Sequence, residues 1–311
     1  MTVRIVTDST ADLTPELVEQ LGITVVPAYV QFGNKCYRDG VDIGHDELYR
    51  RIEDGSFKAT TSQPTPSDFA SAYKKLSREA DEIISIQVTS KLSGTYSSAL
   101  QGKEMMEGKY NIEVIDSLST SMGLGLLTLA AARLAQAGKN ITEITEEIKA
   151  MVSKTHIYAV FDTLKYVLQG GRLGKAKMLL NNILNVKPML TLRKGTIWPL
   201  GIARTRSKGI EKLLDMLRKN PNAHEVGIVH STTPDEAQTL KERVSSIIDK
   251  SRINISRLGP ALGVHGGPGA LVLAFIEKIH VLGQEAGEDE AEYKGISLPS
   301  INMPKLCSVY R

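Results

Sequence analysis

The sequence predicts a two-domain α/β protein, with a parallel, Rossmann-like sheet in the first domain and a mixed sheet in the second. Strand-like and helix-like patterns alternate almost from the first residue, as they do where helices connect parallel strands. The length of 311 residues exceeds that of most single domains. A hairpin signal at residues 193–195 indicates antiparallel pairing in the second half.

The first domain is expected over residues 1–154. A short apolar strand covers 3–6, and Thr14 followed by Pro15 is typical of a helix N-terminus. Residues 23–30 are β-branched around Pro27, which predicts a strand at a sheet edge. The further expected elements are a hairpin turn at Gly33-Asn34, a helix from Thr65, a strand over 83–88, a helix after Ser93, a strand over 112–115, and helices near 120–137 and 142–153.

The second domain is expected over residues 155–278. Its predicted strands cover 156–161 and 186–192, with a helix near 175–184 between them and the hairpin after them. The later elements are a helix near 207–219, a strand over 225–230, a helix near 234–249, and strands near 252–257 and 270–275. Residues 279–311 are first rich in glycine and acids and then polar, which predicts an appended tail.

Composition argues against several classes of function. Hydrophobic residues make up 41% of the chain and charged residues 23%, so it can bury a core. A net charge of +3 and only 5% aromatic residues disfavour nucleic-acid binding. Cys36 and Cys307 do not indicate a disulfide framework. There is no signal-peptide pattern, and the apolar run over 122–132 is too short for a bilayer, so we expect a cytoplasmic protein without stable membrane insertion.

Motifs for nucleotide and hydrolase sites are not matched. The first strand is followed by residues 8–12, DSTAD, rather than by G-x-G-x-x-G. Residues 170–176 invite a phosphate-loop interpretation, but the glycines are one residue too close, and Ala176 stands where Ser or Thr would bind Mg²⁺. No G-x-S-x-G nucleophile motif is present. No nucleotide cofactor is therefore expected.

Metal sites are not indicated either. The six histidines lack the paired spacing of a zinc site. Asp39, Asp42 and Asp46 are close in sequence but do not match an EF-hand loop, so we interpret them as acids of a solvated loop.

Four polar segments, covering 60–64, 90–95, 203–207 and 264–269, are expected after strands and before helices, where α/β folds place ligand groups. Their chemistry is that of donors: hydroxyls, backbone N–H groups at a helix start, a guanidinium and an imidazole. The residues concerned are Thr61, Ser62, Ser93, Gly94, Arg204 and His265. Together they would fit a carboxylate or phosphate. Taken singly, each also has an ordinary structural role as a cap, a turn residue, a surface cation or a core histidine.

At these segments the chain resembles the DegV family, whose better-understood members are fatty-acid-binding subunits of bacterial fatty acid kinase. The resemblance runs from Val3 to about Phe275. Six motifs occur in family order, at residues 8–13, 61–64, 91–96, 170–173, 203–205 and 265–270. Any one of them is weak evidence, whereas six in order are strong.

The resemblance implies a two-domain, DegV-like fold with one long-chain fatty acid buried between and within the domains. It implies that Thr61, Ser93 and His265 bind the carboxylate. The head-group vicinity would further contain Ser62, Gly94, Thr95 and Arg204. Arg172 would contact an ATP-dependent kinase subunit that phosphorylates the bound acid. The chain itself would then be a carrier without catalytic residues, with the fatty acid as ligand and no cofactor.

The chain departs from the family pattern in three places. Gly266-Gly267 stands where Val-Gly is common, which would loosen the loop that carries His265. Thr65 stands where Ser is frequent, and the tail over 279–311 has no recognised family counterpart.

Two other functions stay open at this point. The first is an enzyme acting on a small phosphorylated or carboxylated metabolite at the same anion site, which the glycine-rich loops and Arg204 motivate. The second is a DNA-binding regulator, which only Lys175, Lys177 and neighbouring Arg172 support. The low net charge and the lack of a helix-turn-helix pattern weaken that second function.

Overall fold

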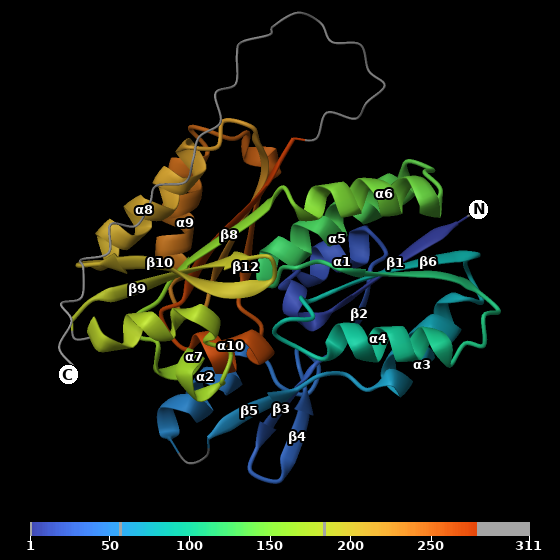
Figure 1. Ribbon diagram of the computed structural model, residues 1–311, viewed down its shortest axis with the longest axis horizontal. Coiled ribbons are helices and arrows are strands. Elements are labelled where there is room, and N and C mark those ends of the chain that lie inside the picture. The colour runs from blue at the N-terminus through green and yellow to red at the C-terminus, as the bar shows by residue number, and fades with distance from the viewer. Residues whose placement is uncertain (1, 56–57, 183–184, 279–311) are drawn as a thin grey trace, which may run out of the picture. The chain divides into compact units, whose positions relative to one another are not determined.

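The computed structural model describes residues 2–55, 58–182 and 185–278, which form three sheets surrounded by helices (Figure 1). These residues belong to one compact unit. The tail that the sequence predicts over 279–311, with Cys307, lies outside the described residues.

Four parallel strands form the first sheet, in the order β2-β1-β6-β7. Its strands are β1 (Val3–Asp8), β2 (Thr24–Val26), β6 (Glu82–Gln87) and β7 (Asn111–Asp116). β6 is buried along its whole length, as expected for a central parallel strand with helices on both faces. The predicted parallel sheet is therefore confirmed. Its helices are α1 (Pro15–Gln20), α3 (Pro66–Leu76), α4 (Thr95–Glu104), α5 (Ser121–Gln136) and α6 (Ile141–Val152).

The predicted helix starts at Thr14 and Thr65 are confirmed by their hydrogen bonds. The Thr14 hydroxyl oxygen accepts the N–H of Leu17, with Pro15 as the first helical residue. Thr65 and Asp68 form a reciprocal capping box at the start of α3. Both helices thus begin where their local sequence satisfies the free N–H groups of the first turn.

Residues 23–30 form parts of two strands in different sheets, and the first of these, β2, lies at the edge of the parallel sheet, which confirms the edge position predicted for part of this run. Pro27 separates β2 from β3 (Tyr29–Phe32), because proline has no N–H to donate to a sheet. β3 joins an antiparallel sheet of order β4-β3-β5, with β4 (Lys35–Arg38) and β5 (Ala59–Ser62). The predicted turn at Gly33-Asn34 is confirmed as the β3–β4 hairpin.

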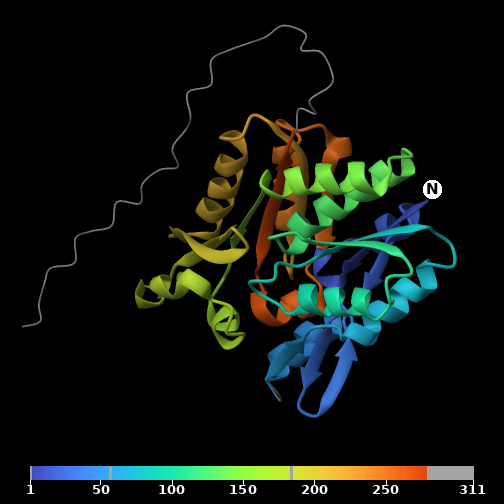
Figure 2. The same ribbon diagram turned by 45° about the vertical axis from the view of Figure 1, so that its right-hand side comes forward.

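Two helices that the sequence analysis missed, α2 (His45–Asp54) and α10 (Pro260–Gly266), pack against this small sheet. Figure 2 shows the small sheet projecting from one end of the parallel sheet. α10 starts with a proline and contains two glycines, so its sequence gives little helical signal.

Six strands after residue 154 form the mixed sheet, in the order β10-β9-β8-β13-β11-β12. They are β8 (Thr155–Val160), β9 (Lys187–Arg193), β10 (Thr196–Ala203), β11 (Ala223–His230), β12 (Ile253–Arg257) and β13 (Leu271–Glu277). β11 and β12 are parallel, and the other neighbouring strands are antiparallel. α8 (Arg206–Arg218) and α9 (Pro234–Val244) pack on this sheet. The mixed sheet is confirmed, and the division into domains at residue 154 stays a prediction.

The segment between β8 and β9 differs from its prediction. It contains the short helix α7 (Lys165–Gln169) and a 3₁₀ helix over Gly174–Asn182, not one α-helix near 175–184. Leu173 and Ala176 are both buried, and their spacing of three suits the three-residue turn of a 3₁₀ helix. The backbone of Gly174 has φ +51°, a conformation that does not continue an α-helix.

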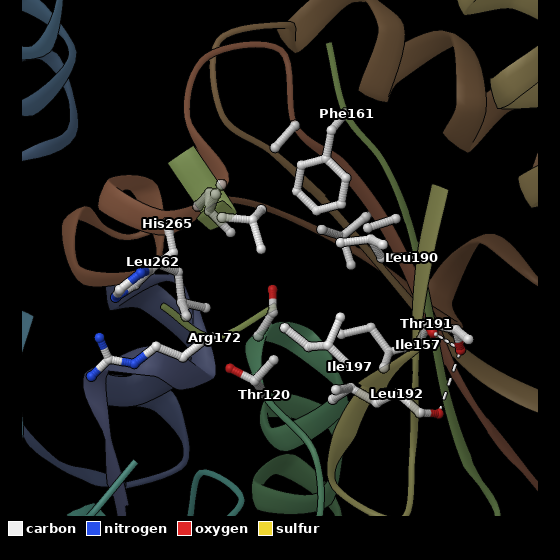
Figure 3. Close-up of a pocket in the computed structure, with 17 residues that line it drawn as sticks. Thr120, Ile157, Phe161, Arg172, Leu190, Thr191, Leu192, Ile197, Leu262 and His265 are labelled. Atoms are coloured by element: carbon white, nitrogen blue, oxygen red, sulfur yellow. Dashed lines mark hydrogen bonds between the residues drawn. The ribbon is translucent and has the colours of Figure 1, made fainter. Parts of the chain in front are cut away.

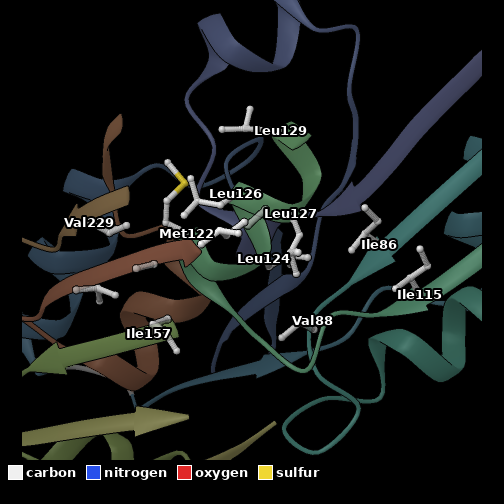
Figure 4. Close-up of a cluster of buried hydrophobic side chains, with 14 of the residues drawn as sticks. Ile86, Val88, Ile115, Met122, Leu124, Leu126, Leu127, Leu129, Ile157 and Val229 are labelled. Carbon is white, nitrogen blue, oxygen red and sulfur yellow. The ribbon is translucent and has the colours of Figure 1, made fainter. Parts of the chain in front are cut away.

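The central helix α5 packs between the parallel sheet and the mixed sheet (Figure 4). Leu124, Leu126, Leu127 and Leu129 are all fully buried, so the helix has an apolar contact on nearly every side. No helix in the described ranges is long and apolar enough to cross a membrane.

Two glycines allow α5 to approach its neighbours closely. A side chain on Gly227 of β11 would place its Cβ 2.0 Å from Met122 Cγ. A side chain on Gly125 would place its Cβ 2.5 Å from the carbonyl oxygen of Ala11. Contacts this short do not occur with real side chains, so the position of α5 requires glycine at both places.

We expect Leu124→Ala to lower the free energy of unfolding by about 2–5 kcal/mol, because it leaves a cavity between the two sheets. Chemical denaturation monitored by circular dichroism measures the change. The control is Leu168→Ala, whose side chain is 39% exposed, and its effect should stay below about 1 kcal/mol. Equal effects of the two substitutions would contradict the central role of α5.

Candidate functional site

Two adjoining pockets lie beside the N-terminal end of α5. One has several hydroxyl groups among apolar side chains and is called the polar pocket, and the other is lined almost wholly by hydrocarbon and is called the apolar pocket. The polar pocket lies between β5, the β6–α4 loop and α10, and the apolar pocket lies among β8, β9, β10 and β13. Five residues line both pockets: Thr120, Arg172, Ile197, Leu262 and His265. A single ligand could therefore extend from one pocket into the other.

The polar pocket brings together side chains from segments that are far apart in sequence. Thr61 and Ser62 come from β5, Ser93 and Thr95 from the start of α4, and His265 from α10. The sequence predicted all five as head-group residues. Their convergence agrees with that expectation, although the ligand that they bind stays a prediction.

Thr61 and His265 contact each other directly. Thr61 Oγ1 lies 2.8 Å from His265 Nε2, a hydrogen bond that joins the small sheet to α10. His265 Nδ1 is buried and has no hydrogen-bond partner among the described residues. The ring packs against Gly170, where a Cβ would lie 2.0 Å from Nδ1. The first glycine of the Gly-Gly-Arg-Leu motif therefore leaves room for the imidazole.

The His265 imidazole is neutral at ordinary pH. Burial and, to a smaller extent, the nearby Arg172 guanidinium together lower its pKa to about 4. A neutral imidazole carries one proton. If Nε2 carries it and donates to Thr61 Oγ1, the Thr61 hydroxyl proton is free for an anionic ligand. In the other tautomer Nε2 accepts that proton from Thr61.

Ser93 and Thr95 form the second donor group. Their hydroxyl oxygens are 2.8 Å apart, and Ser93 Oγ also accepts the N–H of Thr95 at 3.3 Å. Gly94 is the N-cap of α4, and a side chain there would overlap Gln63 Nε2, with its Cβ 2.6 Å away. The first turn of α4 contains no acidic residue. The positive end of this helix is therefore available to an anion.

The apolar pocket is lined almost entirely by hydrocarbon (Figure 3). His265 and Arg172 lie at one end, and Ile157, Thr191 and Leu192 lie at the other. The Thr191 hydroxyl donates to the carbonyl oxygen of Ile157 at 2.8 Å, so this polar atom is already satisfied. The cavity volume of this pocket is about 120 Å³.

The two predicted arginines lie in different places. Arg172 is exposed, lines both pockets, and donates to the carbonyl oxygen of Gly170 at 2.6 Å. Arg204 is exposed in the β10–α8 connection and lines neither pocket. The structure thus brings Arg172 to the site and leaves Arg204 outside the pocket walls.

The predicted position of one polar segment is wrong. Residues 264–269 were expected between a strand and a helix, but His265 lies within α10 and the segment leads into β13. Gly267 has φ +69° and Gly269 has φ +75°, so the turn after α10 depends on glycine. Side chains there would overlap Tyr166 and Asp162. The Gly-Gly pair therefore fits this turn closely.

The interpretation of Asp39 as a solvated acid is also wrong. Its side chain is buried and accepts the Ser9 hydroxyl proton at 2.7 Å. Burial raises its pKa to about 7. Asp42 and Asp46 are exposed, as expected, and pair with Arg38 and Arg257. Sequence spacing alone could not separate one buried acid from two exposed ones.

Sequence reasoning missed Thr120 and Leu262, which line both pockets. Thr120 directly precedes α5 and follows the parallel strand β7. The rule that ligand groups follow the carboxyl ends of parallel strands would have found it. Leu262 carried no signal, because α10 was not predicted.

This arrangement supplies donors and lacks an activated nucleophile. A threonine or serine nucleophile needs a base that a third group orients. His265 Nδ1 has no such partner, and the low pKa makes the ring a weak base. Among the residues described, no cluster of His, Cys, Asp or Glu could hold a metal ion. The site is suited to binding an anion beside an apolar chain.

Comparison with known proteins gives consistent results. A sequence profile of the DegV family, described as uncharacterised proteins, matches residues 2–278. A DegV domain-containing protein of Caldanaerobacter subterraneus is 35% identical over 279 residues, which is 89% of this chain and 99% of that protein. A structure of a fatty-acid-binding DegV family protein from Thermus thermophilus matches with a TM-score of 0.84 and 31% identity, over 89% of this chain and 100% of that one. A stearic-acid-binding protein from Eubacterium ventriosum matches with a TM-score of 0.79 and 29% identity, over 88% and 98%.

We expect the His265 ring to stay neutral down to about pH 5, with a titration midpoint near 4. Because this pKa lies below the unfolded value, the stability that depends on the neutral ring is fully present above about pH 6.5 and is lost as the pH falls toward 4. Imidazole ¹⁵N NMR of the intact protein measures the midpoint. A midpoint near 6.5 would contradict the burial of the ring.

Proposed function

The chain belongs to the DegV family, and we propose that it binds one long-chain fatty acid, with the carboxylate beside Thr61, Ser93 and His265. The observation that carries the proposal is the junction of the two pockets. The apolar pocket adjoins the donor-lined one, and five residues line both. A molecule with a hydrocarbon tail and a small anionic head fits this division.

The relatives support this choice of ligand. The Thermus thermophilus protein is a fatty-acid-binding protein, and the Eubacterium ventriosum protein binds stearic acid. Each CH₂ group that leaves water contributes about 0.8 kcal/mol. The tail would therefore supply most of the affinity, and the hydroxyl groups would fix the orientation of the head.

The apolar lining of this pocket argues against an enzyme for a small polar metabolite. Such a substrate would leave the space from Phe161 to Leu192 unused. The Thr61–His265 pair also lacks the orienting group of a catalytic dyad. We therefore prefer a carrier over the alternative enzyme that the sequence left open.

We further propose that the carrier acts in the cytoplasm and presents its fatty acid to an ATP-dependent kinase subunit. In that reaction a carboxylate oxygen attacks the γ-phosphorus of ATP, the bond to the β-phosphate oxygen breaks, and an acyl phosphate and ADP form. Arg172 lines the pocket, and Arg204 directly follows β10. Both side chains are exposed cations. Such cations suit contact with the phosphate groups of the ATP that the kinase subunit would hold.

The double variant Thr61→Val, Ser93→Ala should lose its bound fatty acid while keeping its fold. The substitutions remove two donors to the carboxylate, and each donor to a charged group contributes about 1.5–3 kcal/mol. Denaturing mass spectrometry of an organic extract measures the lipid per protein, and circular dichroism checks the fold.

The matched control is Thr60→Val, Ser97→Ala. Thr60 donates to Gln31 on the outer side of β5, and Ser97 is exposed on α4. This control should retain lipid at the wild-type level. Equal lipid in the two double variants would refute the head-group assignment, and a wild-type protein that takes up no fatty acid would refute the function.

Arg204→Ala should leave fatty-acid binding unchanged and slow phosphorylation of the bound acid. Arg204 lines neither pocket, so its removal cannot affect the ligand directly. A coupled ADP assay with a bacterial fatty acid kinase subunit and the loaded carrier measures the rate, and we expect a loss of at least about tenfold, or about 1.4 kcal/mol. An unchanged rate would exclude Arg204 from the partner contact.

A further inference from the structure

Two buried carboxyl groups, those of Asp12 and Asp39, meet at the N-terminal end of α10. Asp12 follows β1 and its short 3₁₀ turn, and Asp39 follows β4. A Cβ on Gly259, the N-cap of α10, would lie 3.1 Å from Asp12 Oδ1 and 3.6 Å from Asp39 Oδ2. Both carboxyl groups therefore approach the same backbone position.

Asp12 connects α10 to α5. Its Oδ1 accepts the N–H of Gly259 at 2.8 Å, and its Oδ2 accepts the Ser121 hydroxyl proton at 2.5 Å. Ser121 is the first residue of α5 and lines the apolar pocket. Asp12 and Ser121 both have positive φ, +52° and +49°, which is uncommon for residues other than glycine. The backbone on both sides of this contact is thus held in an unusual conformation.

Asp39 connects α10 to the β2–β3 junction. It accepts the Ser9 hydroxyl proton at 2.7 Å and also interacts with the amide of Ala261 in α10. Ser9 Oγ in turn accepts the N–H of Ala28 at 3.0 Å. Ala28 and Ala261 both line the polar pocket. The two carboxyl groups therefore hold α10 against three separate segments that border the ligand site.

In the part of the chain that the structure describes, the groups that face this pair offer no compensating cation. The charges that act on Asp12 are those of Asp39 and Asp8, and the charge that acts on Asp39 is that of Asp8. From α2, Tyr49 faces both carboxyl groups, and burial keeps its pKa well above the ordinary value. Beyond the Tyr49 ring lies Arg257, which pairs with the exposed Asp46 and lowers the pKa of His45.

Burial without a cation disfavours the charged form of both acids. Burial raises the pKa of Asp12 to about 8 and that of Asp39 to about 7, and the neighbouring carboxyl groups act in the same direction. The hydrogen bonds from Ser121, Gly259 and Ser9 oppose this effect without cancelling it. The pair therefore keeps protons at neutral pH that a solvated carboxyl would release.

We propose that Asp12 and Asp39 are positioning residues that hold α10, and with it Leu262 and His265, in the ligand-binding position only while the pair is protonated. Leu262 and His265 line both pockets, so a shift of α10 changes the acyl wall and the head-group donors together. Ionisation of the pair favours an arrangement in which α10 moves away and water reaches the carboxyl groups. This inference rests on the proposed fatty-acid binding and adds its regulation by pH.

The sign of the pH effect follows from the raised pKa values. Each group stabilises the docked position of α10 fully below about pH 4, and this contribution is lost as the pH rises through about 7 for Asp39 and about 8 for Asp12. Fatty acid should therefore be held most tightly under mildly acidic conditions. It should be released as the pH rises above 7.

The test measures equilibrium binding of radiolabelled hexadecanoic acid to delipidated protein between about pH 6 and pH 9. The variant is Asp39→Asn, which keeps the shape of the side chain and removes its charge. The control is Asp42→Asn, three residues away, whose exposed carboxyl pairs with Arg38 and has a pKa lowered to about 2. The carboxyl group of the fatty acid also titrates, but its titration affects every variant equally. The effect of Asp39 is therefore the difference between the pH profile of a variant and that of the wild type.

We expect the affinity of the wild type to fall relative to Asp39→Asn by up to about tenfold over this range, because one linked proton with a midpoint near pH 7 is lost mainly between about pH 6 and pH 7. Asp42→Asn should follow the wild type at every pH. Superimposable profiles for the wild type and Asp39→Asn would overturn the proposal and leave fatty-acid binding intact. A wild type that binds no fatty acid at any pH would instead overturn the proposed function.

A second measurement decides the coupling even if Asp39→Asn fails to fold or no ligand binds. The amide ¹H and ¹⁵N resonances of Gly259 and Ala261 in the wild-type protein report the charge of Asp12 and Asp39 directly. They should shift with midpoints near pH 8 and pH 7. Resonances that stay constant between about pH 5.5 and pH 9 would rule out the proposed proton linkage.

Discussion

The burial of α5 between two sheets is the constraint on which the rest of the structure depends. A helix that is apolar on nearly all sides must be covered on all sides, so the parallel sheet and the mixed sheet both pack against it. Gly227 and Gly125 provide the space for this contact. Because α5 starts at the carboxyl end of β7, its N-terminal residues necessarily reach the place where the two sheets diverge. The two pockets lie at that place.

The two pockets place an apolar compartment and a hydroxyl-lined compartment in different parts of the fold. The apolar compartment is made by strands of the mixed sheet, whose inward side chains are hydrocarbon. The polar compartment is made by loops and strand ends, where hydroxyl groups and helix N–H groups are available. α10 contributes to both through Leu262 and His265. Its anchoring by Asp12 and Asp39 therefore affects head and tail at once.

Much of the site could be predicted from local sequence, and its failures have identifiable causes. Thr61 lies shortly before the predicted helix start at Thr65, and Ser93 lies just before α4, so both could be placed near helix starts. α10 was missed because proline and glycine give little helical signal, although its neighbours hold it as a helix. Asp39 was misread because its burial depends on contacts with Ser9 and α10, which are distant in sequence.

The sequence by itself determined the alternation of strands and helices, the helix starts at Thr14 and Thr65, and the identity of the polar segments, because these depend on periodicity and on neighbouring residues. Only the tertiary structure decided that Thr61 lies 2.8 Å from His265, and that the pocket beside them is apolar. These features join residues about 200 positions apart, and no local pattern encodes such a distance. They arise from the packing of two sheets around one helix.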